Sequence, residues 1–129
     1  MLLDTCFCID LIREGKAKRT GPATEKLINL KDTQLFMSLF SLCELRAGAE
    51  LSANPVKELE RVENMLAFIS IVYPEPSFPV FYGEAEASLR KKETPIPVMD
   101  LLIGITAKAA GMPLITKDTR HFRLIPGLV

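Results

Sequence analysis

The fold is decided first by residues 1–12, which read Met-Leu-Leu-Asp-Thr-Cys-Phe-Cys-Ile-Asp-Leu-Ile. The short apolar run Met1–Leu3 has the character of a buried strand and stops at Asp4-Thr5. The apolar residues that follow continue as a helix toward Gly15. A strand that passes directly into a helix is the first half of a βαβ unit, so this stretch already favours a parallel sheet.

The same switch between short apolar runs and helical periodicity recurs along the chain. Further strands are predicted at Leu35–Met37, Ser70–Tyr73 and Pro113–Thr116, and the tail 122–129 is a candidate edge strand. Helices are predicted after Pro22, from Ser41 to about Leu51, from Pro55 to about Ile69, from Phe78 to Leu89 and from Asp100 to Ala110. This alternation predicts an α/β fold, a three-layer α/β/α sandwich around a parallel sheet of four to five strands, formed as one domain over residues 1–129.

Composition excludes several classes of protein. The 129 residues are 48% hydrophobic and 25% charged, which is typical of a globular domain and excludes a mainly disordered chain. Sixteen Lys and Arg balance sixteen Asp and Glu, which excludes a histone-like binder but not a nuclease with a local basic surface. Three cysteines, an odd number, favour a reducing compartment. With no apolar run of roughly 18–20 residues and no basic leader, we expect a cytoplasmic protein without a membrane segment.

Four carboxylates fall where an open parallel sheet leaves a crevice, at the carboxyl ends of its strands. Asp4 follows the first strand, Glu44 follows the second, and Asp118 follows the last, while Asp100 begins the helix that leads into that last strand. Each has a structural explanation when taken alone. Asp4 and Asp100 suit helix N-caps worth about 1 kcal/mol each, Glu44 completes a capping box with Ser41, and Asp118 suits an Asx turn.

Taken together, the four acids predict a cation site. Two bare carboxylates about 4 Å apart repel by about 4 kcal/mol at an effective dielectric near 20, so such a cluster must protonate, pair or bind a cation. Oxygen ligands favour Mg²⁺ or Mn²⁺, which also bind phosphate oxygens. The chemistry that fits these ions is metal-assisted hydrolysis of phosphodiesters.

Four segments resemble the acidic motifs of the PIN-domain family, in order and over essentially the whole chain. They are Leu2–Thr5, Ser41–Gly48, Pro95–Ile103 and Leu114–Phe122, with a closing Ile125–Leu128. The similarity is greatest to the VapC branch, the toxin half of VapBC toxin–antitoxin pairs.

The resemblance implies a Mg²⁺- or Mn²⁺-dependent endoribonuclease, usually a homodimer, whose acidic site is covered by a cognate antitoxin protein. Carried over by position, Asp4, Glu44, Asp100 and Asp118 match the metal-binding, catalytic acids, and Thr5 and Thr116 match flanking hydroxyls that orient them. Two positions depart from the family pattern: Cys6 stands where Asn is frequent, and Val98 stands where a further acid is frequent.

Basic residues lie close to the acidic motifs in the sequence and are candidate contacts for the RNA phosphates. These candidates are Arg13, Lys92, Lys117 and Arg120. Asp10 is expected to point away from Asp4 and is left out of the site. Cys6, Cys8 and Cys43 are interpreted as buried structural cysteines, because a tetrahedral zinc site needs four placed ligands, and His121 as a solvated or hydrogen-bonded surface residue.

Two other functions stay open at this point. Cys6 and Val98 favour a catalytically decayed PIN-like module that docks protein or RNA. A receiver-like domain that accepts a phosphoryl group has a similar size. It needs adjacent acids after the first strand, however, where this chain has Asp4-Thr5, and an acceptor Asp after the third, which ends in Tyr73-Pro74.

Overall fold

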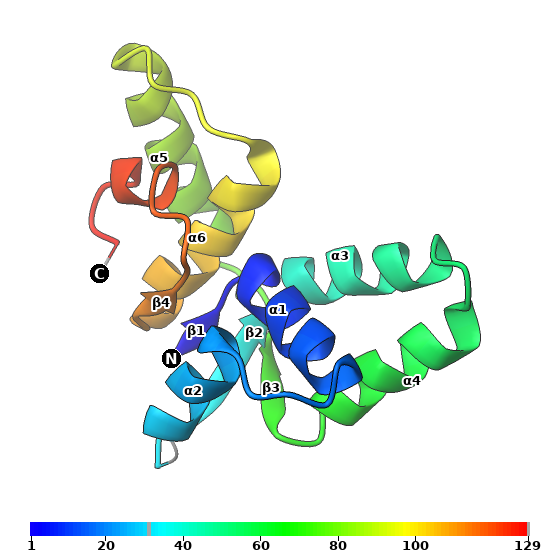
Figure 1. Ribbon diagram of the computed structural model, residues 1–129. Coiled ribbons are helices and arrows are strands. Elements are labelled where there is room, and N and C mark those ends of the chain that lie inside the picture. The colour runs from blue at the N-terminus through cyan, green and yellow to red at the C-terminus, as the bar shows by residue number, and fades with distance from the viewer. Residues whose placement is uncertain (31, 129) are drawn as a thin grey trace.

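The computed structural model describes residues 1–30 and 32–128, and its centre is a parallel sheet (Figure 1). The strands are β1 (Leu2–Leu3), β2 (Leu35–Ser38), β3 (Ile69–Val72) and β4 (Leu114–Ile115). They are ordered β3-β2-β1-β4, and every neighbouring pair is parallel. The first strand of the chain therefore lies between the second and the last.

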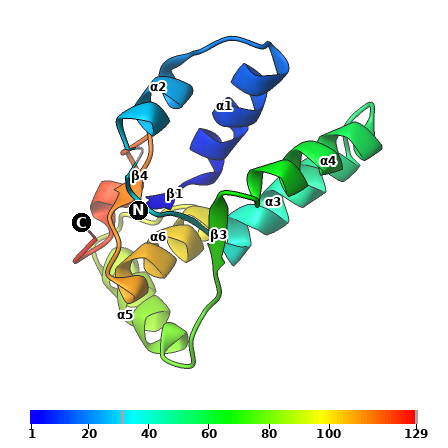
Figure 2. The same cartoon turned by 90° about the horizontal axis from the view of Figure 1, so that it is seen from below.

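In the part of the chain that the structure describes, six helices connect and cover these strands, as the alternating sequence pattern predicted. They are α1 (Thr5–Lys16), α2 (Pro22–Asn29), α3 (Leu39–Glu50), α4 (Pro55–Met65), α5 (Phe78–Lys91) and α6 (Val98–Ala110). Figure 2 shows α3 and α4 side by side, projecting from the sheet, with α5 and α6 on the other side of it. The α/β/α sandwich is confirmed.

Adjacent residues of β1 show why there are three layers. Leu2 and Leu3 are both fully buried, and because side chains alternate along a strand they enter different cores. Leu3 packs with residues of α1 to α4, whereas Leu2 packs with residues of α5 and α6. The two cores lie on opposite faces of the sheet.

Three predicted element ends are wrong by a few residues. Helix α3 begins at Leu39, and its cap is Ser38, whose hydroxyl accepts from the Ser41 backbone N–H at 3.0 Å. The predicted capping box of Ser41 and Glu44 is therefore absent, and Ser41 lies inside the helix. Helix α6 begins at Val98, which places Asp100 in its first turn rather than at its N-cap. Helix α4 ends at Met65, and Ile69 instead begins β3.

The C-terminal tail differs most from the prediction. It forms a short 3-10 helix, η1 (Phe122–Leu124), so the described residues contain four strands and no edge strand after β4; Val129 lies outside the described residues. Ile125 packs against α6 at Gly104, where an added Cβ would lie 2.3 Å from the Ile125 Cδ1 atom. That close approach lets the apolar tail complete the core instead of extending the sheet. Among the helices of residues 1–30 and 32–128, none has both the length and the apolar character to span a membrane.

Candidate functional site

Helices α1 and α3 begin directly after β1 and β2, at the carboxyl edge of the sheet, and α6 begins close to them (Figure 1). Asp4 caps α1, Glu44 lies in the second turn of α3, and Asp100 lies in the first turn of α6. Three of the four predicted acids therefore come from three different segments of the chain to one edge. We call this place the acidic edge.

Asp4 is the most buried of these acids, with 3% of its surface exposed. Its carboxylate accepts from the Phe7 backbone N–H at 2.8 Å, which confirms the predicted N-cap. Burial raises the pKa of Asp4, and the negative charges of Asp100 and Asp10 raise it further, while the Thr116 side chain and the Phe7 N–H partly offset this. The charge of Asp10 therefore reaches Asp4, although the sequence placed Asp10 outside the site.

Glu44 ends a chain of hydroxyl groups. The Thr5 hydroxyl donates to Glu44 Oε1 at 2.7 Å, and its oxygen lies 3.0 Å from Ser41 Oγ, which in turn lies 3.4 Å from Ser38 Oγ. Thr5, Ser38 and Ser41 are all buried, so this chain fixes the carboxylate from beneath. The supporting role predicted for Thr5 has a direct geometric basis. Ser41, predicted only as a helix cap, is a further member, and so is Ser38, which the sequence did not single out.

Cys6 lies among the acids. Burial raises the pKa of its thiol, and so do the negative charges of Asp4, Asp100, Asp10 and Glu44. The charges of these four carboxylates therefore all act on one position on the first turn of α1. Cys6 and Cys43 are exposed, so the expectation that all three cysteines are buried holds only for Cys8.

The remaining acids are held by basic partners. Asp100 Oδ2 lies 2.7 Å from His121 Nδ1, with both side chains about one third exposed (31% and 34%). Asp118 forms a two-pronged ion pair with Arg120 at 3.1 and 3.0 Å, and it also accepts from the Arg120 backbone N–H, which confirms the predicted Asx turn. These bonds lower the pKa of Asp118 to about 2. Its side chain is directed to Arg120, and Thr116 accepts from its backbone N–H at 3.0 Å.

The donor atoms fit a hard divalent cation, but they are not arranged around one. Within residues 1–30 and 32–128, no three His, Cys, Asp or Glu side chains lie close enough together to enclose a metal ion. The carboxylates of Asp4, Glu44 and Asp100 nevertheless offer only oxygen ligands, and their charges all raise the pKa of the Cys6 thiol. Asp4 is also buried, which raises its own pKa because its charged form is poorly solvated. A cation would relieve that repulsion, so the chemistry of the residues is compatible with Mg²⁺ or Mn²⁺.

The candidate RNA contacts are dispersed. Lys117 forms an ion pair with Asp10 beside the acidic edge, and Arg13 lines the same hollow as this pair. Arg120 is engaged by Asp118. Lys92 follows α5, whose C-terminal end lies at the top of Figure 1, away from α1 and α3. The structure therefore brings Arg13 and Lys117 together, and not all four.

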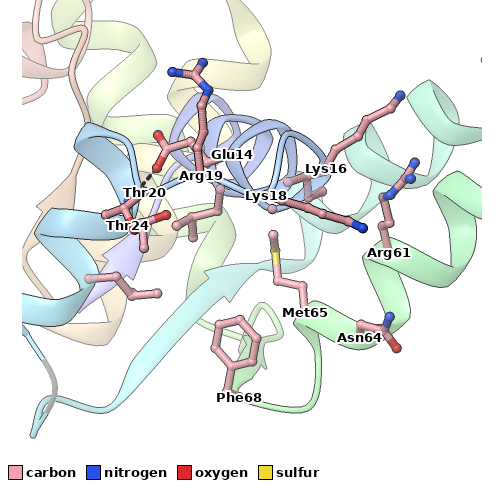
Figure 3. Close-up of a pocket in the computed structure, with 14 residues that line it drawn as sticks. Glu14, Lys16, Lys18, Arg19, Thr20, Thr24, Arg61, Asn64, Met65 and Phe68 are labelled. Atoms are coloured by element: carbon pink, nitrogen blue, oxygen red, sulfur yellow. Dashed lines mark hydrogen bonds between the residues drawn. The ribbon is translucent and has the colours of Figure 1, made fainter.

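Within the described residues, three hollows border α1, and the smallest, of about 360 Å³, is lined by Glu44 and lies between α1, α3 and α4. The other two are larger. One, of about 580 Å³, lies between α1, α2 and α4, with Lys18 and Arg61 on one side and Met65 and Phe68 below them in Figure 3. The other, of about 520 Å³, lies between α1, α2 and the end of β4. Glu14 of α1 borders both, and Figure 3 shows its carboxylate bonded toward Thr24 of α2.

Comparison with known proteins places this geometry in a family. The PIN domain family matches residues 1–128. The chain is 29% identical over 127 residues to the tRNA(fMet)-specific endonuclease VapC of Salmonella typhimurium, covering 98% of this chain and 92% of that protein. It is 28% identical, over the same shares of both chains, to ribonuclease VapC1 of Haemophilus influenzae.

Solved structures agree with this assignment. A chain in the crystal structure of VapBC2 from Rickettsia felis, bound to a promoter DNA fragment, superposes with a TM-score of 0.90 at 25% identity, covering 99% of this chain and 94% of that one. A chain of DNA-bound VapBC from Salmonella typhimurium superposes with a TM-score of 0.87 at 28% identity, covering 98% and 92%.

Proposed function

The chain belongs to the PIN-domain family, and from that premise we propose that it is a divalent-metal-dependent endoribonuclease and the toxin of a type II toxin–antitoxin pair. Curated relatives that carry VapC names are ribonucleases, and similar solved structures are VapBC assemblies. The substrate is RNA, and the bond broken is a phosphodiester.

The observation that carries this proposal is that Asp4 caps α1, Glu44 is bonded to Thr5 in the same turn, and Asp100 lies in the first turn of α6 at the same edge. They belong to the starts of three helices: α1 follows β1, α3 follows β2, and α6 follows α5. Their proximity therefore follows from the sheet topology and not from local sequence. The charged form of a buried carboxylate beside other acids destabilises the fold unless a cation binds to it, as the raised pKa of Asp4 indicates.

Each residue has a proposed part. Asp4, Glu44, Asp100 and Asp118 hold the cation, which supplies a polarised phosphate and an activated water when bound. Asp118 joins the others by leaving Arg120, which its 42% exposed side chain permits. Thr5 and Ser41 hold the carboxylate of Glu44 in place, and Thr116 stabilises the charged form of Asp4.

The test is cleavage of RNA by the purified protein with Mg²⁺ or with Mn²⁺. Cleavage is expected with either ion, to stop when a chelator is added, and to be lost in Asp4→Asn and Asp100→Asn. A matched control is Asp32→Asn, which removes one carboxylate outside the four motifs. Cleavage that survives in both site variants would contradict the assignment, because a contaminating nuclease is unaffected by either substitution.

We also propose that a small antitoxin protein binds the chain and silences it, and that the chain forms a homodimer. The support is that the superposing structures are VapBC complexes. Co-expression with the neighbouring small reading frame is expected to yield a stable complex without ribonuclease activity. Light scattering on the isolated chain is expected to give twice its mass, whereas a monomer at all concentrations would contradict the dimer.

A second function is favoured by how the acids are held in this structure. Asp100 and Asp118 are engaged by His121 and Arg120, and Cys6 stands in the first turn of α1 beside Asp4. A PIN-fold module without catalysis, docking protein or RNA, would have this arrangement. Titration calorimetry separates the two proposals: heat of Mg²⁺ or Mn²⁺ binding at millimolar concentration that disappears in Asp4→Asn supports the nuclease, and its absence supports the module.

A further inference from the structure

We propose that the hollow of about 520 Å³ between α1, α2 and the end of β4 binds the nucleotide next to the scissile phosphate. We call it the flanking subsite. The proposal rests on the ribonuclease function above and adds a place for the RNA strand beside the acidic edge.

The position of the hollow joins it to the acidic edge. The Asp4 backbone N–H donates to the Ile115 carbonyl oxygen at 3.1 Å, and Ile115 lines the hollow. Phe7, whose backbone N–H donates to the Asp4 carboxylate at 2.8 Å, also lines it. A strand whose phosphate lies at Asp4 therefore has its neighbouring nucleotide within reach of this hollow.

The charge of the hollow suits a phosphate. Four cationic side chains line it, from α1, the following loop, α2 and the turn after β4: Arg13, Arg19, Lys26 and Lys117. Lys117 is paired with Asp10, whereas in the described part of the chain no ion pair involves Arg13, Arg19 or Lys26. The other acid present, Glu14, already accepts three backbone N–H groups. Because the formal net charge of the whole protein is zero, this local excess of positive charge is distinctive.

The apolar part of the lining suits a base. Phe7, Pro22 and Ile115 line the hollow together with the cationic side chains. Phe7 is buried, Ile115 is half-buried and Pro22 is exposed. A volume of about 520 Å³ lies within the roughly 300–1,000 Å³ of small-ligand sites. The apolar and cationic parts of the lining together match one nucleotide, with its base against the apolar residues and its phosphate against the cations.

The hollow on the other flank of α1 is less suited to this role. Its lining contains none of the four acids and neither Thr5 nor Thr116, so it has no direct connection to the acidic edge. A third hollow, of about 360 Å³ between α1, α3 and α4, contains Glu44, but its two cations are matched by two acids and Lys16 is paired with Glu58. The flanking subsite has the excess of positive charge that a phosphate needs.

The first experiment measures RNA affinity without catalysis. Binding of a fluorescent single-stranded RNA is followed by anisotropy in a chelator, over a range of salt, for Arg19→Ala/Lys26→Ala and for the control Lys57→Ala/Lys91→Ala. The control removes the same charge from two other exposed positions, on α4 and α5. We expect the subsite variant to bind RNA about 10-fold more weakly. The slope of log K against log salt concentration is expected to become shallower by about 1.4, which is about 0.7 for each of two lost phosphate contacts. The control is expected to stay within about 2-fold of the unaltered protein.

The second experiment places the base. RNA containing 4-thiouridine is crosslinked to the full chain with light, and the modified peptides are identified by mass spectrometry. Crosslinks in residues 20–26 or 115–117 support the proposal, and crosslinks confined to other segments overturn it. Equal weakening of RNA and poly-glutamate binding in the subsite variant also overturns it, because that result shows an acidic-peptide contact in place of a nucleotide.

Cleavage with Mg²⁺ separates failure of this inference from failure of the proposed function. We expect the subsite variant to raise KM about 10-fold with kcat unchanged, as for a contact made equally before and during the chemical step. If the unaltered protein cleaves RNA and the subsite variant matches it in KM and salt slope, only the flanking subsite is overturned. If the unaltered protein neither binds nor cleaves RNA, both proposals fall.

Discussion

Helix α1 carries two buried carboxylates near its two ends, and their environments are opposite. Asp4 at the start is 3% exposed, and Glu14 near the end is 6% exposed. Glu14 accepts from the backbone N–H groups of Gly21, Ala23 and Thr24 at 2.9–3.0 Å, and so caps α2. Asp4 accepts a backbone N–H from Phe7 and lies beside other acids.

The pKa values follow from this difference. Hydrogen bonds, first from Thr24 and then from Ala23 and Gly21, lower the pKa of Glu14 to about 2. Burial and neighbouring charge raise the pKa of Asp4. Burial alone therefore does not separate a structural acid from a functional one. The number of donors that face the carboxylate separates them. Three backbone N–H groups neutralise the charge of Glu14 within the fold, whereas Asp4 has one such donor and can still bind a cation.

The largest expected effect is on catalysis. Asp4→Asn is expected to lower RNA cleavage by at least about 100-fold. Its melting temperature is expected to hold or rise, because Asn also caps helices and carries no buried charge. Cleavage rate and thermal unfolding of one preparation check both parts. A large loss of stability in this variant would show that Asp4 is structural like Glu14.

The matching change at the other end of the helix acts on stability. Glu14→Gln is expected to lower the melting temperature by about 5 °C. Three backbone N–H groups donate to the two carboxylate oxygens of Glu14, whereas the amide of Gln has only one acceptor oxygen. Glu25→Gln, an exposed acid in the first turn of α2, is the control and is expected to change the melting temperature little. Equal melting temperatures for the two variants, measured by circular dichroism, would remove Glu14 from the capping role.

A bound cation is expected to stabilise the protein through Asp4. At a Mg²⁺ concentration about ten times Kd, the folded state gains about 1.4 kcal/mol, since the ion binds the folded chain alone. Melting curves with and without Mg²⁺ measure this gain. It is expected to vanish in Asp4→Asn and to persist in Glu14→Gln, and the reverse pattern would contradict the comparison.

Two glycines test the Glu14 cap by shape alone. A Cβ at Gly21 would lie 2.5 Å from Glu14 Cδ, whereas a Cβ at Gly15 would meet nothing within 4 Å. Gly21→Ala is expected to displace the carboxylate and destabilise the fold. Gly15→Ala, inside α1, is expected to stabilise it by about 0.5–1 kcal/mol. Chemical denaturation of both variants measures this, and a stabilising Gly21→Ala would show that the carboxylate moves aside freely.

The smallest effect is on the pH dependence of stability. The pKa of Glu14 falls from its ordinary 4.5 to about 2, so the unfolded chain binds the extra proton in this range and stability rises with pH. Asp4 has the opposite sign: its pKa is raised above 3.8, so stability falls as pH rises through that raised value. Denaturation at a series of pH values is expected to show a weaker acid loss in Glu14→Gln and a steeper gain with pH in Asp4→Asn. Parallel curves for both variants would contradict the assigned signs.

The sequence predicted the parts of the site that depend on local pattern. Asp4 ends an apolar run and begins a helix, so both its cap and its place at the sheet edge follow from neighbouring residues. The sequence predicted Ser41 as the N-cap of α3, whereas the N-cap is Ser38. Either serine can precede a helix, and only the end of β2 decides between them. That end depends on pairing with other strands, which a single stretch of sequence does not contain.

Contacts between distant segments were not predictable in the same way. Glu14 reaches α2 across the loop 17–20, and no spacing rule connects its side chain to those N–H groups. The orientation of Asp118 toward Arg120 is a choice of side-chain rotamer, which the acidic motif leaves open. The tail 122–129 has strand-like composition, yet Ile125 finds a deeper apolar site against Gly104.

The pairing of the first strand with the last has a consequence for synthesis of the protein. Leu2 pairs with Leu114, so one side of β1 stays unoccupied until residue 114 has been translated. Ile115, whose carbonyl oxygen accepts from the Asp4 backbone N–H, arrives with the same segment. A nascent chain therefore lacks one wall of its acidic edge until residues 114–116 have emerged from the ribosome.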